Sequence, residues 1–107
     1  MDFEEIGKDM LEAAWNVLKE RAPGIRSYTE GEFKKLAQTL ATIEVSRAQN
    51  QISDEEARIL VEMQKGASRA VLLTTAGLEV VVVERAINAA LGAVKSAVNT
   101  ALGFALL

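Results

Sequence analysis

The fold of this chain is decided by its residues 70–107, AVLLTTAGLEVVVVERAINAALGAVKSAVNTALGFALL. Of the 12 basic and 15 acidic residues in the chain, this stretch holds only Glu79, Glu84, Arg85 and Lys95. The interior of one small domain is too narrow to surround a long apolar helix on every side. The stretch must therefore be covered by a fold-back onto the rest of the chain, by further copies of the chain, or by lipid.

The first 52 residues have the pattern of an amphipathic helical hairpin. Asp2 with Glu5, and Thr29 with Glu32, have the spacing of capping boxes at helix starts. Apolar residues recur at helical spacing after each pair. A stop at residues 22–24 separates the two runs, because its proline disfavours helical geometry at the residue before it. We expect two antiparallel helices of roughly 20 residues each.

A third helical run begins at Ser53, which forms another capping-box pattern with Glu56. No proline and no Asn-Gly or Asp-Gly pair interrupts residues 68–107. We therefore favour one long apolar helix over residues 53–107, continuous or kinked near Gly77. The alternative is a break at residues 74–77, after which a fourth helix folds back. The sequence thus predicts a single all-α domain over residues 1–107, in which the hairpin of residues 1–52 and the long helix pack as a helical bundle.

The chain lacks the residues on which most catalytic and metal sites depend. It has no histidine, which removes the commonest general base and most zinc and iron ligand sets, and it has no cysteine. No glycine-rich phosphate loop or nucleophile elbow is present. Glu5, Asp9 and Glu12 share one helical face beside Lys8, which we interpret as a solvated face. We expect no catalytic, metal or cofactor site, no small-molecule substrate, and no enzyme activity.

The most informative pattern is a row of five alanines at strict i+4 spacing near the end of the chain. Such a row makes a smooth ridge that lets another helix backbone approach closely, and alanine loses little rotamer entropy on packing. Bulky aliphatic residues form a second side of the same helix. The alternative is that the row is incidental, because alanine is the best helix former. We predict an oligomer interface made by Ala89, Ala93, Ala97, Ala101, Ala105, Leu91, Val94, Val98 and Leu102.

Two charges interrupt the apolar stretch at Glu84 and Arg85. Buried charges are costly unless they are paired. We therefore interpret these two residues as register charges, which meet opposite charges on another helix or subunit. The alternative is that this part of the helix reaches solvent.

These patterns favour a non-enzymatic structural or interaction protein that self-assembles through its alanine-rich C-terminal helix as a homo-oligomer. The net charge of −3 and the absence of a basic block argue against a nucleic-acid partner. The acidic start of the chain lacks the basic and apolar regions of a secretory signal, so we expect a cytoplasmic protein.

Two alternatives remain open. A membrane-active protein, tail-anchored or pore-forming, would insert residues 86–107 and be membrane-associated. Lys95 lies near the middle of that stretch, at a cost of about 2.5–3.5 kcal/mol on insertion scales. A monomeric four-helix bundle acting as an adaptor would require the break near Gly77.

Overall fold

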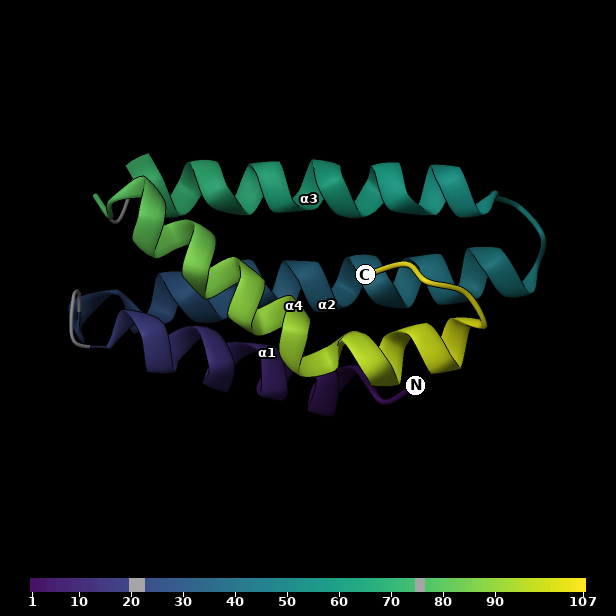
Figure 1. The fold of residues 1–107 in the computed structure, drawn as a ribbon, viewed down its shortest axis with the longest axis horizontal. Coiled ribbons are helices and arrows are strands. Elements are labelled where there is room, and N and C mark those ends of the chain that lie inside the picture. The colour runs from purple at the N-terminus through teal and green to yellow at the C-terminus, as the bar shows by residue number, and fades with distance from the viewer. Residues whose placement is uncertain (20–22, 75–76) are drawn as a thin grey trace.

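The structure is a computed structural model that describes residues 1–19, 23–74 and 77–107, and their helices pack as an all-α bundle (Figure 1). The predicted all-α helical bundle is confirmed. Within the described residues there is no strand. The elements are α1 (Phe3–Leu18), the short 3-10 helix η1 (Pro23–Ile25), α2 (Arg26–Ala48), α3 (Asp54–Thr74) and α4 (Val80–Leu102).

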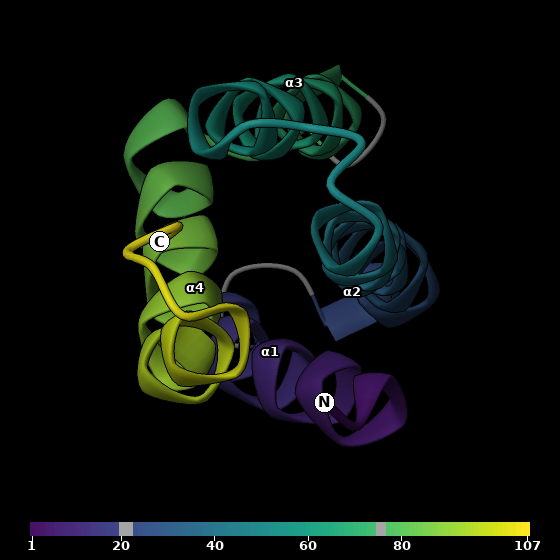
Figure 2. The ribbon, with the colours of Figure 1, turned by 90° about the vertical axis from the view of Figure 1, so that its right-hand side faces the viewer.

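The four α-helices run alternately up and down along one long axis. That axis measures 41 Å, and a helix of 23 residues is about 35 Å long, so the longest helices extend over most of the molecule. Viewed end-on, the helices lie around a square in the order α3, α2, α1 and α4 (Figure 2). The pairing of α1 with α4 is the most extensive, whereas α3 and α4 share the least extensive contact of the four neighbouring pairs.

Two helix starts follow the local chemistry that the sequence predicts. The Asp2 carboxylate accepts hydrogen bonds from the backbone N–H groups of Glu4 and Glu5, at 3.1 and 3.2 Å. Before α3, the Ser53 hydroxyl accepts from the Glu56 N–H at 3.1 Å, and the Glu56 carboxylate accepts from the Ser53 N–H at 3.0 Å. This reciprocal pair is a capping box, as predicted.

The capping box predicted at Thr29 is wrong. Because α2 already begins at Arg26, Thr29 lies inside the helix, where its hydroxyl donates to the Ile25 carbonyl at 3.1 Å. Glu32 is buried and accepts from Lys35 one turn further on, at 3.1 Å. The 3-10 helix η1 leads directly into α2 and so replaces a capping residue at this start. Residue 22 of the predicted stop lies outside the described residues.

The single helix predicted over residues 53–107 is also wrong, because the chain has the alternative arrangement. Helix α3 ends at Thr74, and α4 begins at Val80 and runs back antiparallel to it. Gly77 has φ = +65°, a left-handed conformation that glycine adopts without steric cost. The Leu78 N–H donates to the Leu72 carbonyl at 3.4 Å and satisfies one of the last carbonyls of α3. Residues 75 and 76 of the predicted break lie outside the described residues.

One hydrophobic core joins all four helices. It holds Phe33 as its largest fully buried side chain, together with Met10 of α1, Leu72 of α3 and Ile87 of α4. The reversal near Gly77 is therefore favoured by tertiary packing, since it allows α4 to bury its aliphatic side against α1. This burial outweighs the hydrogen bonds that an unbroken helix would keep.

Candidate interaction surface

The bulky side of α4 is covered by the chain itself. The side chains of Leu91, Val94 and Val98 are 9%, 1% and 0% exposed, and α1 is the helix that α4 contacts most. Leu102 is partly buried against the same core. These four residues of the predicted oligomer interface therefore pack in or against the monomer's core. A second copy docked on the folded chain would not meet Val94 and Val98, which are fully covered.

The small side of α4 has the opposite environment. Ala93, Ala97 and Ala101 are exposed, and Ala89 is half-buried. Ala105, the fifth alanine of the predicted row, is exposed but lies beyond the end of α4 at Leu102. A second exposed row lies beside the alanines at the same i+4 spacing. We call the part of the two rows that is both exposed and within α4 the small-residue face: Gly92, Ala93, Ser96, Ala97, Thr100 and Ala101.

The small-residue face is uncharged, and the exposed Lys95 is the single charged residue between Gly92 and Ala101. None of its side chains is larger than threonine, so another helix could approach the α4 backbone closely. A face of this kind has little shape and no charge of its own. It is suited to helix packing.

The two charges singled out in the sequence have different environments. Glu84 forms an ion pair with Arg69 of α3, in which the Arg69 Nε and Nη2 donate to the two carboxylate oxygens. This pair joins α3 to α4 within one chain. Arg85 is exposed, and none of residues 1–19, 23–74 and 77–107 forms an ion pair with it.

Residues 103–107, which we call the closing segment, turn back sharply after α4. Gly103 has φ = +79° and its N–H donates to the Asn99 carbonyl at 2.9 Å, which ends the helix. The Asn99 side-chain oxygen then accepts from the N–H groups of Leu106 and Leu107, each at 3.0 Å. One amide side chain thus satisfies two backbone donors of the segment.

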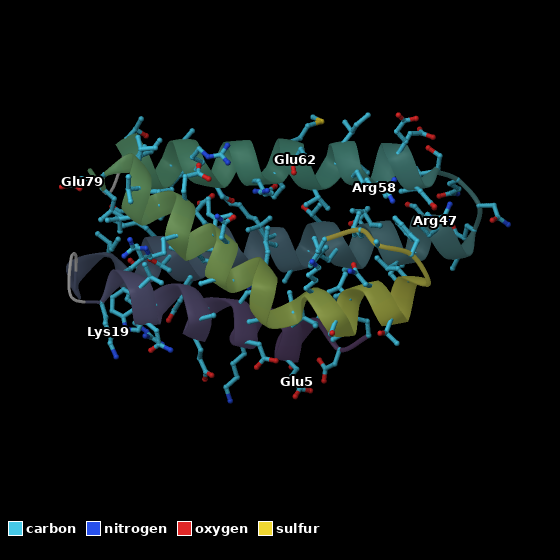
Figure 3. All side chains as sticks on the ribbon, in the orientation of Figure 1. Glu5, Lys19, Arg47, Arg58, Glu62 and Glu79 are labelled. Carbon is cyan, nitrogen blue, oxygen red and sulfur yellow. The ribbon has the colours of Figure 1, made fainter. Side chains whose placement is uncertain are left out.

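Two arginine side chains make cation–π contacts with the aromatic ring of the closing segment. The guanidinium carbons of Arg47, at the end of α2, and Arg58, on α3, lie 5.1 and 5.5 Å from the centre of the Phe104 ring. Figure 3 labels both arginines at the end of the molecule where the closing segment begins. Arg58 also donates from Nε and Nη2 to the Ala105 carbonyl, at 3.3 and 3.2 Å. These contacts attach the end of the chain to the α2–α3 corner.

The contacts of Arg47 and Arg58 with the Phe104 ring were not predicted from the sequence. Asn99 and Gly103 are typical of a helix end, and this signal could have predicted the turn. The two arginines are 57 and 46 residues away from Phe104, so no local pattern connects them.

A second surface feature is an open groove of about 500 Å³ between α1 and α2. Its floor contains Phe3, Leu11 and Ala37, and its rim carries both acidic and basic residues. A Cβ added to Gly7 would lie 3.4 Å from the Cβ of Ala37, so the two helices are in close contact beneath the groove.

The apolar side chains of Ile59 and Met63 project from α3 and are 54% and 66% exposed.

The described residues bring together no group of three acidic, histidine or cysteine side chains that could hold a metal ion. None of the described helices combines the length and the apolar character that crossing a membrane requires. Comparison of the chain with protein-family models, with curated proteins and with solved structures finds no match.

Proposed function

We propose that this protein is a non-enzymatic interaction protein of the cytoplasm that self-associates through the small-residue face of α4. The observation that carries the proposal is the division of α4 into two sides. Its aliphatic side is buried against α1, whereas its rows of small residues remain exposed over more than two turns. The proposed face keeps Ala93, Ala97 and Ala101 of the predicted interface, whereas the aliphatic residues of that interface lie in or against the core.

Small side chains allow close helix contact at low entropic cost. Alanine and glycine lose no side-chain rotamer freedom when they are buried, and serine and threonine lose little. Ridges at i+4 spacing on two copies can interlock, with a crossing angle of about −50°. Symmetric pairing of one face with itself gives a closed dimer, the commonest form of homo-oligomer.

The small-residue face is too small to form a stable interface by itself. It extends over only about 15 Å along one helix. A stable interface buries about 800 Å² on each partner, so residues around this face must contribute as well. We therefore place it at the centre of the interface, inside a polar rim.

Sedimentation equilibrium of the wild-type chain and of Ala97→Arg tests this proposal. The arginine would place a long charged side chain at the centre of the small-residue face, so the variant should be monomeric. Ala70→Arg is the matched control, since Ala70 is an exposed alanine inside α3. This control should associate as the wild type does. Equal association of all three chains would refute the proposed face.

A monomeric adaptor is the second candidate, and the completeness of the core favours it. Each of the four α-helices contributes buried side chains to one core within a single chain, so this core forms without a second copy. The adaptor would use the groove between α1 and α2, whose apolar floor suits the apolar side of a partner helix. A monomeric wild-type chain at micromolar concentration would favour this candidate over self-association.

A further inference from the structure

The closing segment fills a wedge between two diverging helices. Helix α4 starts beside the end of α3 and then crosses diagonally towards α1, as Figures 1 and 2 both show. The far end of α4 is therefore separated from α3, and the closing segment turns back into this space. Leu106 is buried there, 7% exposed. Leu106 and Leu107 line one groove together with Val61 of α3 and Leu91 of α4.

Every group that holds the closing segment lies earlier in the chain. Arg47 and Arg58 contact the Phe104 ring, Arg58 binds the Ala105 carbonyl, and Asn99 binds the last two N–H groups. We call Arg47, Arg58, Val61, Leu91 and Asn99 the closing slot. None of them belongs to the small-residue face. The slot recognises a tight backbone turn, in which the Leu106 N–H donates to the Phe104 carbonyl at 3.0 Å, together with one aromatic ring and two aliphatic side chains.

The groove continues beyond the residues that occupy it. A space of about 320 Å³ remains open next to Leu106 and Leu107, and its lining includes Asn88, Lys65 and Lys95. Lys65 is paired with Glu62 at 3.3 Å, whereas Lys95 is exposed on the edge of the groove. A ligand longer than the closing segment would fill this space and bring an acidic group to Lys95.

We propose that the closing slot is a docking site for a short peptide of a partner protein, and that the closing segment occupies this site in cis. The partner peptide carries an aromatic residue, two aliphatic residues at the second and third positions after it, and an acidic residue shortly afterwards. It displaces the closing segment and takes over its hydrogen bonds. Gly103, already in a left-handed conformation, is the point at which the segment swings out.

The closing segment competes strongly with a partner peptide because it is part of the same chain as the closing slot. A short flexible connection gives it an effective concentration in the millimolar range. A partner peptide with only the same five residues would therefore bind the wild-type chain weakly. The additional contacts in the open groove and at Lys95 supply the advantage that a partner needs.

Fluorescence anisotropy with a labelled peptide, Gly-Phe-Ala-Leu-Leu-Ala-Glu, tests this proposal on the full-length chain. The host is the double variant Phe104→Ala, Leu106→Ala, whose own closing segment no longer competes. This host should bind the peptide at least about tenfold more tightly than the wild type does. Adding Arg58→Ala to the host should abolish that gain, and so should replacing the peptide's phenylalanine with alanine.

The folded state of the host is checked by circular dichroism. If the double variant does not fold, Phe104→Leu is the substitute host, and amide hydrogen exchange of Leu106 and Leu107 in the wild type is the second readout. Excess peptide should accelerate that exchange by displacing the segment. A folded host that does not bind, or equal binding by host and wild type, would overturn the proposal. Binding of the labelled wild-type chain but not of the peptide would also overturn it, and would assign the slot to exchange between copies.

Discussion

Arg58 of α3 lies over the ring of Phe104, with its guanidinium carbon 5.5 Å from the ring centre, and it donates two hydrogen bonds to the next carbonyl along the chain. This relationship connects residues 46 positions apart and closes the open side of the bundle between α3 and α4. Arg47 adds a second guanidinium over the same ring and also binds the Ile52 carbonyl, at 2.9 Å. One aromatic residue therefore links the ends of three helices.

Replacement of Phe104 by alanine should lower the free energy of unfolding by about 1–2 kcal/mol, because it removes a partly buried ring and two exposed cation–π contacts. Phe104→Leu retains much of the apolar area and should cost about half as much. Urea denaturation followed by circular dichroism measures both. An alanine variant as stable as the wild type would show that the Phe104 ring and its contacts with Arg47 and Arg58 contribute no stability.

Asn99 should stabilise the closing segment through the side-chain oxygen alone. Asn99→Ala removes the acceptor of the Leu107 N–H and leaves the Leu106 N–H with the Phe104 carbonyl alone, at an expected cost of about 1–3 kcal/mol. Asn99→Asp retains the acceptor and should keep most of the stability. Hydrogen exchange of the Leu106 and Leu107 amides should accelerate in the alanine variant and remain protected in the aspartate variant. Equal protection in both would contradict this role.

Gly77 and Gly66 should respond in opposite ways to replacement by alanine. A Cβ at either position meets no atom within 4 Å, so the effect is conformational in both. At Gly77, φ = +65° makes alanine unfavourable by about 1–2 kcal/mol. At Gly66, inside α3, alanine should stabilise the protein by about 0.5–1 kcal/mol. Thermal denaturation should therefore shift the melting temperature down for the first variant and up for the second, and a shift of the same sign in both would be inconsistent with the α3–α4 reversal.

The ion pair between Arg69 and Glu84 should contribute little to stability despite its position between two helices. Both side chains are about one third exposed, and exposed pairs contribute about 0.2–1 kcal/mol. A double-mutant cycle with Arg69→Ala and Glu84→Ala measures the coupling. Arg85→Ala is the control and should change stability by less than about 0.5 kcal/mol. A stability loss in Arg85→Ala larger than the coupling energy of the pair would contradict our assignment of Glu84 to an ion pair and of Arg85 to the exposed surface.

Local chemistry predicted the parts of the fold that depend on neighbouring residues. The caps at Asp2 and Ser53 are found because the residues that satisfy a helix start lie within a few positions of it. Thr29 has the same pattern and does not cap, since a 3-10 turn had already begun α2. A pattern for a cap therefore predicts a start within a few residues and not its exact position.

Tertiary effects account for what the sequence did not predict. A lone glycine such as Gly77 is compatible with both an uninterrupted helix and a helix end, and the burial of α4 against α1 decides between them. The same burial separates the predicted interface residues, placing Val94 and Val98 in the core and leaving the alanines exposed. Periodicity identified the two sides of α4, but it does not indicate which side packs within the chain.

The mass of the wild-type chain in plain buffer tests the central proposal most directly. The chain has a mass of 11.5 kDa, and self-association through the small-residue face predicts a larger mass that rises with concentration across the micromolar range. Sedimentation equilibrium should give this result for the wild type and for Ala70→Arg, and 11.5 kDa for Ala97→Arg. A wild-type mass of 11.5 kDa at every concentration would contradict the proposal.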